Sequence, residues 1–503
     1  TGVENTAVGV SSLTANTTAS YNTAMGRSAL TTNTTGANNT AIGYDALNAN
    51  TTAANNTAVG MNSLVANTTG HSNTAVGFEA GAANTTGIRL TAFGYQAGKA
   101  HVATGNVQNV FVGNEAGLGN TTGVTNTFIG GSAGAANTTG SQNVAVGTNS
   151  LGANTTGGTN TALGTSSLQA NTTASNNTAV GHGALAANTT GTRNNSLGNS
   201  SLVANTTGDN NVALGSQALQ SNTTADDNTA VGYAALNLNT TGAENTAVGK
   251  FALLSNTTAS YNTAVGEGAL QVTTTGQANT ALGVDVLVAN TTGLDNTAVG
   301  TSALSANTTG SSNTIAGRAA GSSITTGSNN QFFGHDAGIT GSPGGNVTTG
   351  GNNILLGDEN IDYAGIQVDW TVASDARDKT DFTALDLGLD FVKALAPVTY
   401  RWDKRSKYGD KSADDYDLLD QTPDGTHKED WLDIGFKAQE VQALEEAAGY
   451  TTAAKKNLTV STSGDGKQMG LQYSKFVPIL VKAMQEQNAL IEALTARIAT
   501  LEG

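Results

Sequence analysis

Short apolar triplets recur along the chain at a fixed spacing of 17 residues. Each copy reads approximately NTAVGxxALxANTTGxx, and the glycine that closes NTAVG marks 21 copies between Gly9 and Gly357. Such self-similarity is typical of stacked-repeat proteins. The triplets are short, β-branched and uncapped, so they predict strands, while NTTG supplies residues that tolerate positive φ. We therefore predict a mainly β, parallel β-solenoid over residues 1–357, each turn with two short strands and two corners.

Leucine and phenylalanine exchange places between the copies. Four residues after the motif glycine stands a leucine, as in Leu13, or in six copies a glycine. Four of those six copies carry phenylalanine near the motif glycine, at positions 93, 111, 128 and 332–333. Losing a leucine and gaining a phenylalanine roughly conserves volume, as close packing requires. The exchange predicts that the two positions touch inside one core.

The apolar residues of one turn are few, such as Ala7, Val8 and Leu13. Stacked turns would form only a thin slab, so we expect three chains to pack side by side and close the core at the trimer axis. Residues of the Asn5 and Asn16 type would form amide ladders along the stack. At roughly 4.8 Å per turn, the solenoid would be a rod on the order of 100 Å long.

The last 130 residues have a different composition. Residues 1–373 contain 6 Lys and Arg and 16 Asp and Glu, which leaves 16 and 22 for residues 374–503. The pattern there predicts a helix over 383–396 that ends before Pro397, then a strand with Tyr400 and Trp402, then a second helix within DIGFKAQEVQALEEAAG. Helices mixed with strands predict an α+β domain.

The chain ends in a strongly periodic segment. Apolar residues follow one another in alternating steps of three and four, which predicts a coiled-coil seam in a trimeric bundle. The alternative is a helix that lies on its own domain. The expected domains are the solenoid shaft (1–357), a connector (358–373), the α+β domain (374–472) and the coiled-coil helix (473–503). The seam residues are Val477, Leu480, Met484, Ile491, Leu494, Ile498 and Leu501.

Two resemblances extend this picture. The repeats of residues 1–357 resemble the β-roll head repeats of trimeric autotransporter adhesins, NSVAIGxxSxAxG, and repeats in bacteriophage tail fibres. The C-terminal stretches SDARDK, LAPVTYRWDK, IGFKAQEV and YSKFVPILVKAMQE resemble, in order, the intramolecular chaperone auto-processing domain of phage tailspikes and tail fibres. This second resemblance implies a domain that directs trimer folding and then cuts itself off at a serine.

Carried onto this chain, the resemblance implies that Ser374 is the nucleophile, Lys379 its activator and Ala373–Ser374 the bond that is cut. A serine hydroxyl needs a base within hydrogen-bond reach, and a lysine can serve where burial lowers its pKa. Asp375 is a further catalytic candidate, which either orients Lys379 or caps the following turn. The expected activity is a single-turnover, self-cleaving serine peptidase with no external substrate.

The variable positions of the repeat flank its turns, and freedom to vary indicates exposed corners. Three tyrosines at these corners, Tyr44, Tyr95 and Tyr233, are candidates for contact with a host receptor or surface glycan. The alternative is that they are only solvated surface residues.

Several kinds of ligand are disfavoured. A net charge of −16 argues against nucleic acid, since phosphate binding requires clustered Lys and Arg. The five histidines have no metal-ligand spacing and there is no cysteine, so we expect neither a metal nor a cofactor. Nothing reaches the roughly 18 apolar residues of a membrane span, so we expect no membrane insertion.

The leading hypothesis is a homotrimeric phage tail fibre, a shaft or receptor-binding protein of the virion that is assembled in the host cytoplasm. The chain begins with Thr1 and not Met, so we expect it to be a fragment whose missing N-terminal region attaches to the phage tail or baseplate. The alternative is a bacterial trimeric adhesin at the cell surface whose C-terminal trimerisation cap stays attached. A polysaccharide-degrading tailspike would need paired carboxylates, and acids are sparse in the repeats.

Overall fold

The computed structural model describes residues 2–361, 364–365, 367, 372–411, 413, 415–451, 458–463 and 465–502. The chain forms two compact units, Thr1–Ser312 and Asn313–Gly503. The connector predicted over 358–373 lies partly outside the described residues.

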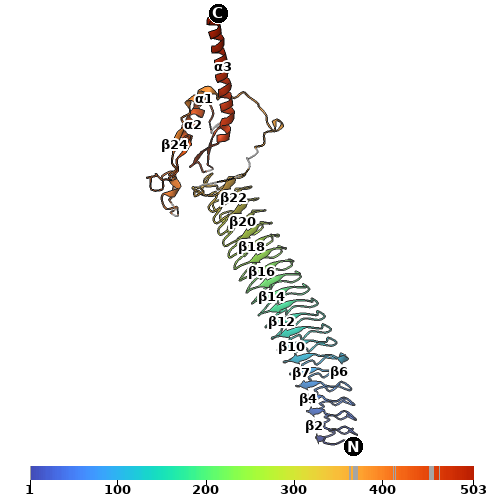
Figure 1. Ribbon diagram of the computed structural model, residues 1–503. Helices are drawn as coiled ribbons and strands as arrows, with labels where there is room; N and C mark the ends of the chain where they lie inside the picture. The colour runs from blue at the N-terminus through green and yellow to red at the C-terminus, as the bar shows by residue number, and fades with distance from the viewer. Residues whose placement is uncertain are drawn as a thin grey trace. The chain divides into compact units, whose positions relative to one another are not determined.

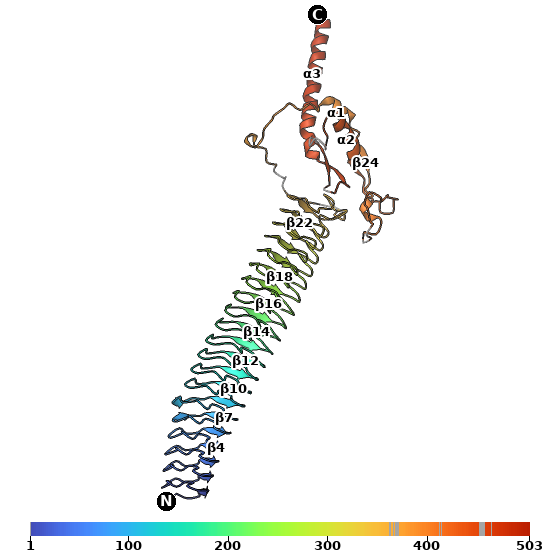
Figure 2. The ribbon, with the colours of Figure 1, turned by 180° about the vertical axis from the view of Figure 1, so that it is seen from behind.

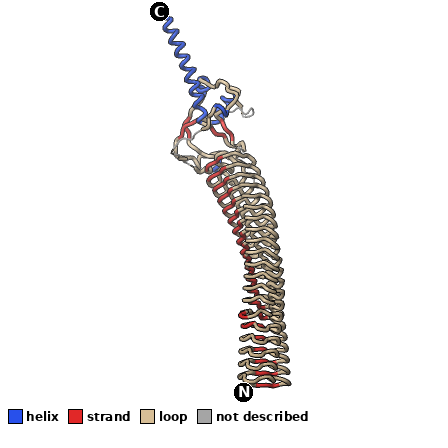
Figure 3. Tube along the Cα trace, turned by 90° about the vertical axis from the view of Figure 1, so that its right-hand side faces the viewer, coloured by secondary structure: helices blue, strands red, loops and turns tan. Residues whose placement is uncertain are grey.

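A long parallel sheet dominates the fold, with 21 strands of three residues each. In Figures 1 and 2 the arrows of β2 to β20 lie one above another, and Figure 3 shows the strands in red among tan turns. The strands in the first unit are β1 (Thr6–Val8), β2 (Thr23–Met25), β3 (Thr40–Ile42), β4 (Thr57–Val59), β5 (Thr74–Val76), β7 (Thr91–Phe93), β9 (Val110–Val112), β10 (Thr127–Ile129), β11 (Val144–Val146), β12 (Thr161–Leu163), β13 (Thr178–Val180), β14 (Asn195–Leu197), β15 (Val212–Leu214), β16 (Thr229–Val231), β17 (Thr246–Val248), β18 (Thr263–Val265), β19 (Thr280–Leu282) and β20 (Thr297–Val299). Those in the second unit are β21 (Thr314–Ala316), β22 (Gln331–Phe333) and β23 (Ile354–Leu356).

Strand pairing follows the repeat: β2 pairs with β3 so that Ala24 lies beside Ala41, one period further on. The predicted parallel β-solenoid is therefore confirmed. The expectation of two strands per solenoid turn is wrong for almost all of them. Each solenoid turn has one strand, and its remaining residues form tight backbone turns. Residues such as Ser28 (φ 59°) and Leu30 (φ 49°) adopt left-handed backbone, which interrupts extended pairing.

The interior of a turn is made by small residues and one leucine. In β2 the middle residue, Ala24, is fully buried, and so are Ala29 and Leu30 from the following turn. The outer strand residues point away from this core, and Met25 is 42% exposed. Val8 is likewise 54% exposed, so in the single chain the Val8-type residues lie outside this core, and their predicted place at a trimer axis stays a prediction. A three-residue strand alternates its faces, so only its middle side chain points inward.

Two structural constraints require glycine at the motif position. Gly26 has φ of 135°, and a Cβ there would lie 2.4 Å from the carbonyl oxygen of Gly43 in the next turn. Any other residue would be both strained and in collision with the neighbouring backbone.

The leucine and phenylalanine exchange is confirmed for the phenylalanines that point inward. Phe111 and Phe128 are fully buried, and a Cβ on Gly117 or Gly134 would lie 2.6 or 2.5 Å from their rings. The interpretation is wrong for Phe93, which is 54% exposed. Phe93 is the third residue of its strand and so belongs to the outer face.

Two ladders of buried asparagines run along the solenoid, as predicted. In the first, the Asn39 backbone N–H donates to Oδ1 of Asn22 at 2.9 Å. In the second, Nδ2 of Asn50 donates to Oδ1 of Asn33 at 2.8 Å and to the Ala53 carbonyl at 3.0 Å. Buried amides whose hydrogen bonds are satisfied fix each turn against its neighbours.

Two turns depart from the period. The turn between Gly334 and Gly357 has six additional residues. The turn between Gly94 and Gly113 has two, and nearby a second pair of strands forms, β6 (Gly87–Ile88) and β8 (Gly105–Asn106). His101 is fully buried, and its Nδ1 lies 3.0 Å from Nδ2 of Asn120 in the second ladder. Its Nε2 is buried with no hydrogen-bond partner among the described residues. Burial lowers the pKa of His101 to about 4.

The second unit also contains the small α+β region. Its elements are η1 (Ala376–Asp378), α1 (Leu389–Ala394), β24 (Val398–Tyr400), η2 (Arg405–Lys407), β25 (Asp433–Gly435), α2 (Ala438–Ala447), β26 (Val460–Thr462), β27 (Met469–Leu471), η3 (Tyr473–Lys475) and α3 (Phe476–Glu502). β24 pairs with β25 and β26 with β27, both antiparallel. The buried core consists of Leu387, Phe391, Val441, Val460, Phe476 and Ile479.

The predicted helix over 383–396 is shorter than expected, since α1 begins at Leu389. Leu387 is buried in the core, and the Leu389 backbone N–H donates to Oε2 of Glu486 on α3 at 2.7 Å. Tertiary contacts thus determine where α1 begins. The expected second helix and strand are present as α2 and β24.

Helix α3 has two apolar faces. Phe476, Ile479 and Ala483 are buried against the α+β region. The predicted seam residues point elsewhere, and Met484 and Leu494 are 68% and 58% exposed. The helix therefore packs on its own domain and also carries an uncovered seam, so pairing in a coiled coil stays a prediction. Among the described residues, no helix combines the length and apolar character that crossing a bilayer requires.

Candidate self-cleavage site

The residues predicted to carry out cleavage lie around a single turn of 3-10 helix, η1, in an otherwise irregular segment. This turn brings Ser374 and Lys379, five positions apart, into contact: Nζ of Lys379 donates to Oγ of Ser374 at 2.6 Å. Both residues, and Ala373 before them, are exposed in the single chain. The predicted nucleophile and its predicted base are thus within proton-transfer distance.

Asp375 contacts a different residue. Its Oδ1 accepts the Arg377 backbone N–H at 2.9 Å, which makes it the N-cap of η1, and its Oδ2 accepts Nη2 of Arg377 at 2.6 Å. The hydrogen bonds from Arg377 lower the pKa of Asp375, and those to Asp375 raise the pKa of Arg377. These contacts favour the capping interpretation, in which Asp375 fixes the turn on which Ser374 and Lys379 meet.

Arg377 has a role that sequence reasoning missed. Its guanidinium holds the Asp375 carboxylate through Nε and Nη2. The signal in the sequence was an acid and an arginine two residues apart. A guanidinium that pairs with both oxygens of a carboxylate keeps that carboxylate from pairing with a nearby lysine.

Comparison with protein families places this site at the edge of a known domain. Residues 374–450 match the peptidase S74 family model, described as chaperone of endosialidase. That stretch is a chaperone-of-endosialidase domain. Its matched part begins at Ser374 and includes Lys379 and the elements from η1 to α2. A search of curated proteins finds no match to the chain.

The chaperone-of-endosialidase family is related to self-cleaving peptidases, so the match implies peptidase-related chemistry for this region. The preceding residues, up to Leu356, are β-solenoid. A repeat shaft followed by such a chaperone fits a protein of the tail-fibre type.

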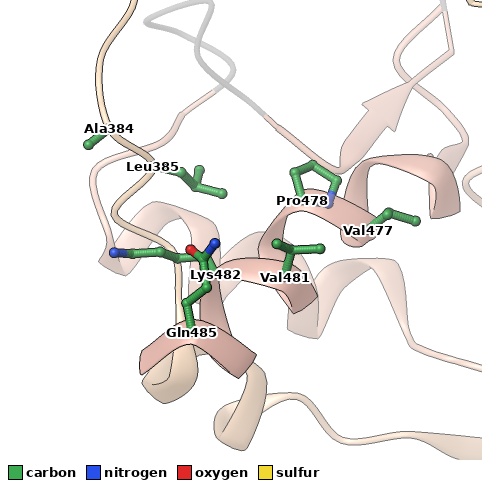
Figure 4. A pocket seen from close by; sticks show the side chains of 7 residues that line it. All are labelled: Ala384, Leu385, Val477, Pro478, Val481, Lys482 and Gln485. Atoms are coloured by element: carbon green, nitrogen blue, oxygen red, sulfur yellow. The ribbon is translucent and has the colours of Figure 1, made fainter. Parts of the chain in front are cut away.

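An apolar groove borders the first turns of α3 in this domain (Figure 4). Leu385 lies on one side, and Val477, Pro478 and Val481 lie along the helix. Val477 is also one of the predicted seam residues and is 59% exposed. The groove and the seam therefore have Val477 in common.

The three tyrosine candidates are on the solenoid surface, apart from the cleavage residues in sequence. Tyr44, Tyr95 and Tyr233 are 41%, 48% and 48% exposed. The Arg27 guanidinium lies 5.6 Å from the Tyr44 ring centroid, and the Phe78 and Tyr95 rings stack at 5.4 Å. Within the described residues, no group of three or more His, Cys, Asp or Glu side chains could hold a metal ion.

Proposed function

We propose that this chain is the shaft of a homotrimeric phage tail fibre whose C-terminal region directs trimer folding and then cuts itself off between Ala373 and Ser374. The observation that carries this proposal is the 2.6 Å contact from Nζ of Lys379 to Oγ of Ser374, at the first residue of the matched domain. The solenoid before it supplies the shaft, and the uncovered seam of α3 supports association of several chains.

The proposed reaction is an acyl shift followed by hydrolysis. Neutral Lys379 takes the Ser374 hydroxyl proton while Oγ bonds to the Ala373 carbonyl carbon. The C–N bond then breaks, and its nitrogen leaves with a proton as the free amine of Ser374. The resulting ester joins Ala373 to the Ser374 side chain, and water hydrolyses it to a carboxylate and a hydroxyl. Because both groups are held in one turn, no encounter step is needed.

Assembly would control this reaction. A lysine acts as a base only when its amine is neutral, and burial favours the neutral form. Lys379 is exposed in the single chain. Neighbouring chains in a trimer would cover this site, so cleavage would follow correct assembly and occur once per chain.

The remaining parts of the proposal concern location and recognition. A tail fibre belongs to the virion and attaches to the phage tail or baseplate. The exposed aromatic corners at Tyr44, Tyr95 and Tyr233 would contact a host receptor or glycan, since aromatic faces stack on sugar rings and on cationic groups.

The intact mass of the purified chain under denaturing conditions tests the cleavage. We expect wild type to give one product that ends at Ala373 and one that begins at Ser374. Ser374→Ala and Lys379→Met should remain full length, because each removes one member of the pair. Ser474→Ala is the matched control, since Ser474 is also an exposed serine of this domain, and it should be cut like wild type.

Full-length wild-type chain in a trimer would contradict self-cleavage. The C-terminal domain would then be a permanent cap, as in the alternative of a surface adhesin. Cutting of Ser374→Ala at the same bond would also contradict the proposal, because the serine would not be the nucleophile.

A further inference from the structure

The outer face of the long sheet carries an uninterrupted apolar row. In each of the 18 strands of this sheet that lie in the first unit, from β1 to β20, the third residue is apolar, and in none is it buried. We call this row the outer column; Met25, Ile42, Leu163 and Leu197 belong to it and are 42%, 38%, 46% and 49% exposed. Members in adjacent turns pair in register, as Met25 does with Ile42. The column is thus a continuous stripe and not a scatter of single residues.

Charge is absent from this face. The first residues of the same strands are also directed outward, and they are threonine, valine or asparagine in each of them. The charged residues of the shaft lie elsewhere, as Arg27 and Asp45 do on the corner that follows the motif glycine. The corners tolerate every residue class, whereas the outer column admits only apolar ones. A constraint of this kind at exposed positions indicates a surface that is covered in use.

We infer that the outer column is the surface through which copies of this chain join side by side, in parallel and in register, with the columns facing one another. This inference rests on the proposed trimer and names the face that forms it. The occupant must present apolar groups at the rise of one turn, about 4.8 Å, over the whole length of the sheet. A second copy meets that requirement because it has the same repeat.

Other occupants fit less well. A glycan presents hydroxyl groups that need polar partners, and the outer column has none, so only the neighbouring row of first strand residues, mostly threonines, could supply them. An unrelated protein would need a matching repeat over the same number of turns. Monomeric proteins rarely leave contiguous apolar patches above about a few hundred Å² exposed. A row of this length is therefore not expected to stay exposed to water.

The seam of α3, in the second unit, is an independent indication of self-association. The seam of α3 is a second apolar row, with Ile491 and Ile498 52% and 53% exposed. Seams of this pattern pair with copies of themselves, and trimeric bundles are one outcome. Two rows in different units thus both suit self-association.

Cysteine crosslinking in the full chain tests the inference, because the chain has no cysteine of its own. Leu163→Cys places a thiol in the outer column, and Met61→Cys places one on a corner. The two side chains are matched, since each is 46% exposed in the single chain. With a short bismaleimide, we expect Leu163→Cys to give covalent dimers on a denaturing gel and Met61→Cys to give none. Leu163→Cys should also react more slowly with a bulky maleimide.

The native mass of the same samples, from light scattering, separates the possible failures. A trimer that crosslinks through Met61→Cys and not through Leu163→Cys would overturn the inference while the trimer itself stands. A monomer with both thiols equally reactive would overturn the inference and the proposed trimer together. Circular dichroism confirms that each variant has folded.

A charge variant gives a second readout. Leu163→Asp would place an acid from each chain in the shared apolar interface, and Met61→Asp would place it in solvent. We expect the first to lower the temperature at which the trimer dissociates and the second to leave it unchanged. Equal effects would count against the outer column as the interface.

Discussion

The solenoid and the C-terminal domain are stabilised in opposite ways. In the solenoid the same contacts recur in each turn: one buried leucine or its replacement, two asparagine ladders and a glycine against the next backbone. In the C-terminal domain six buried residues, three of them in α1 and α3, form the core. The shaft therefore distributes its stability along its length, whereas the domain concentrates it in one place.

This difference suits the proposed roles of the two regions. A shaft must resist local damage after release, and repeated contacts give each segment its own support. A folding domain that is later removed needs enough stability to bring chains together and no more. Removing comparable contacts from each region tests whether their stability is distributed in these two ways.

The largest effect is expected from the concentrated core. Phe476→Ala removes a buried ring from the cluster on α3, which typically costs about 3–5 kcal/mol. We expect the C-terminal domain to unfold and the yield of assembled protein to fall sharply. Limited proteolysis of the domain measures the change. Leu490→Ala is the control, since Leu490 is 55% exposed on the same helix and is not a seam residue; an equal loss there would contradict the assigned core.

A smaller effect is expected at the irregular turn of the solenoid. The pKa of His101 is about 4 in the folded chain, below its ordinary value of 6.5. The folded state therefore binds this proton less well, and the stabilising contribution, present above pH 6.5, is lost as pH falls towards 4. The loss reaches about 3 kcal/mol. Thermal unfolding of wild type and His101→Asn between pH 7 and pH 4 measures it.

The asparagine variant is informative because it restores the residue found elsewhere in the second ladder. Its unfolding temperature should fall less than that of wild type on acidification. A parallel fall in both proteins would show that His101 is not the group responsible.

The smallest effect is expected from one rung of a ladder. Asn205→Ala removes donors to Oδ1 of Asn188 and to the Gly208 carbonyl, both at 3.0 Å. Leaving buried groups unpaired costs about 1–3 kcal/mol. Hydrogen exchange should increase at the adjacent turns and remain low further along the shaft. Thr207→Ala, at an exposed position of the same turn, should change little; protection lost over the entire shaft would contradict distributed stability.

The sequence alone predicted the structural features that follow from the repeat period. The 17-residue spacing predicted the parallel solenoid, the Asn22 and Asn33 types of ladder, and the contact between Gly117 and Phe111. Repetition makes one correct interpretation valid in every turn. The helical pattern at the C-terminus likewise predicted α3.

The errors arose where spacing leaves the direction of a side chain open. The exchange between leucine and phenylalanine did not separate the two last positions of the strand, so Phe93, which is the third residue and faces outward, was predicted to lie in the core together with Phe111. The start of α1 depends on Glu486, which is distant in sequence from Leu389. For the cleavage pair, the resemblance to the chaperone domain implied that Ser374 and Lys379 act together, but the role of Arg377 required atomic positions.

The irregular turns described above have a further consequence. Copies that are nearly identical could align correctly or one turn out of step with almost the same contacts. A turn with two additional residues, between Gly94 and Gly113, occurs once among the described turns and cannot be matched twice. In an assembly whose chains are out of register, this longer turn would lie beside a turn of normal length and would lack its matching contacts. The departures from the repeat thus carry positional information that the repeat itself lacks.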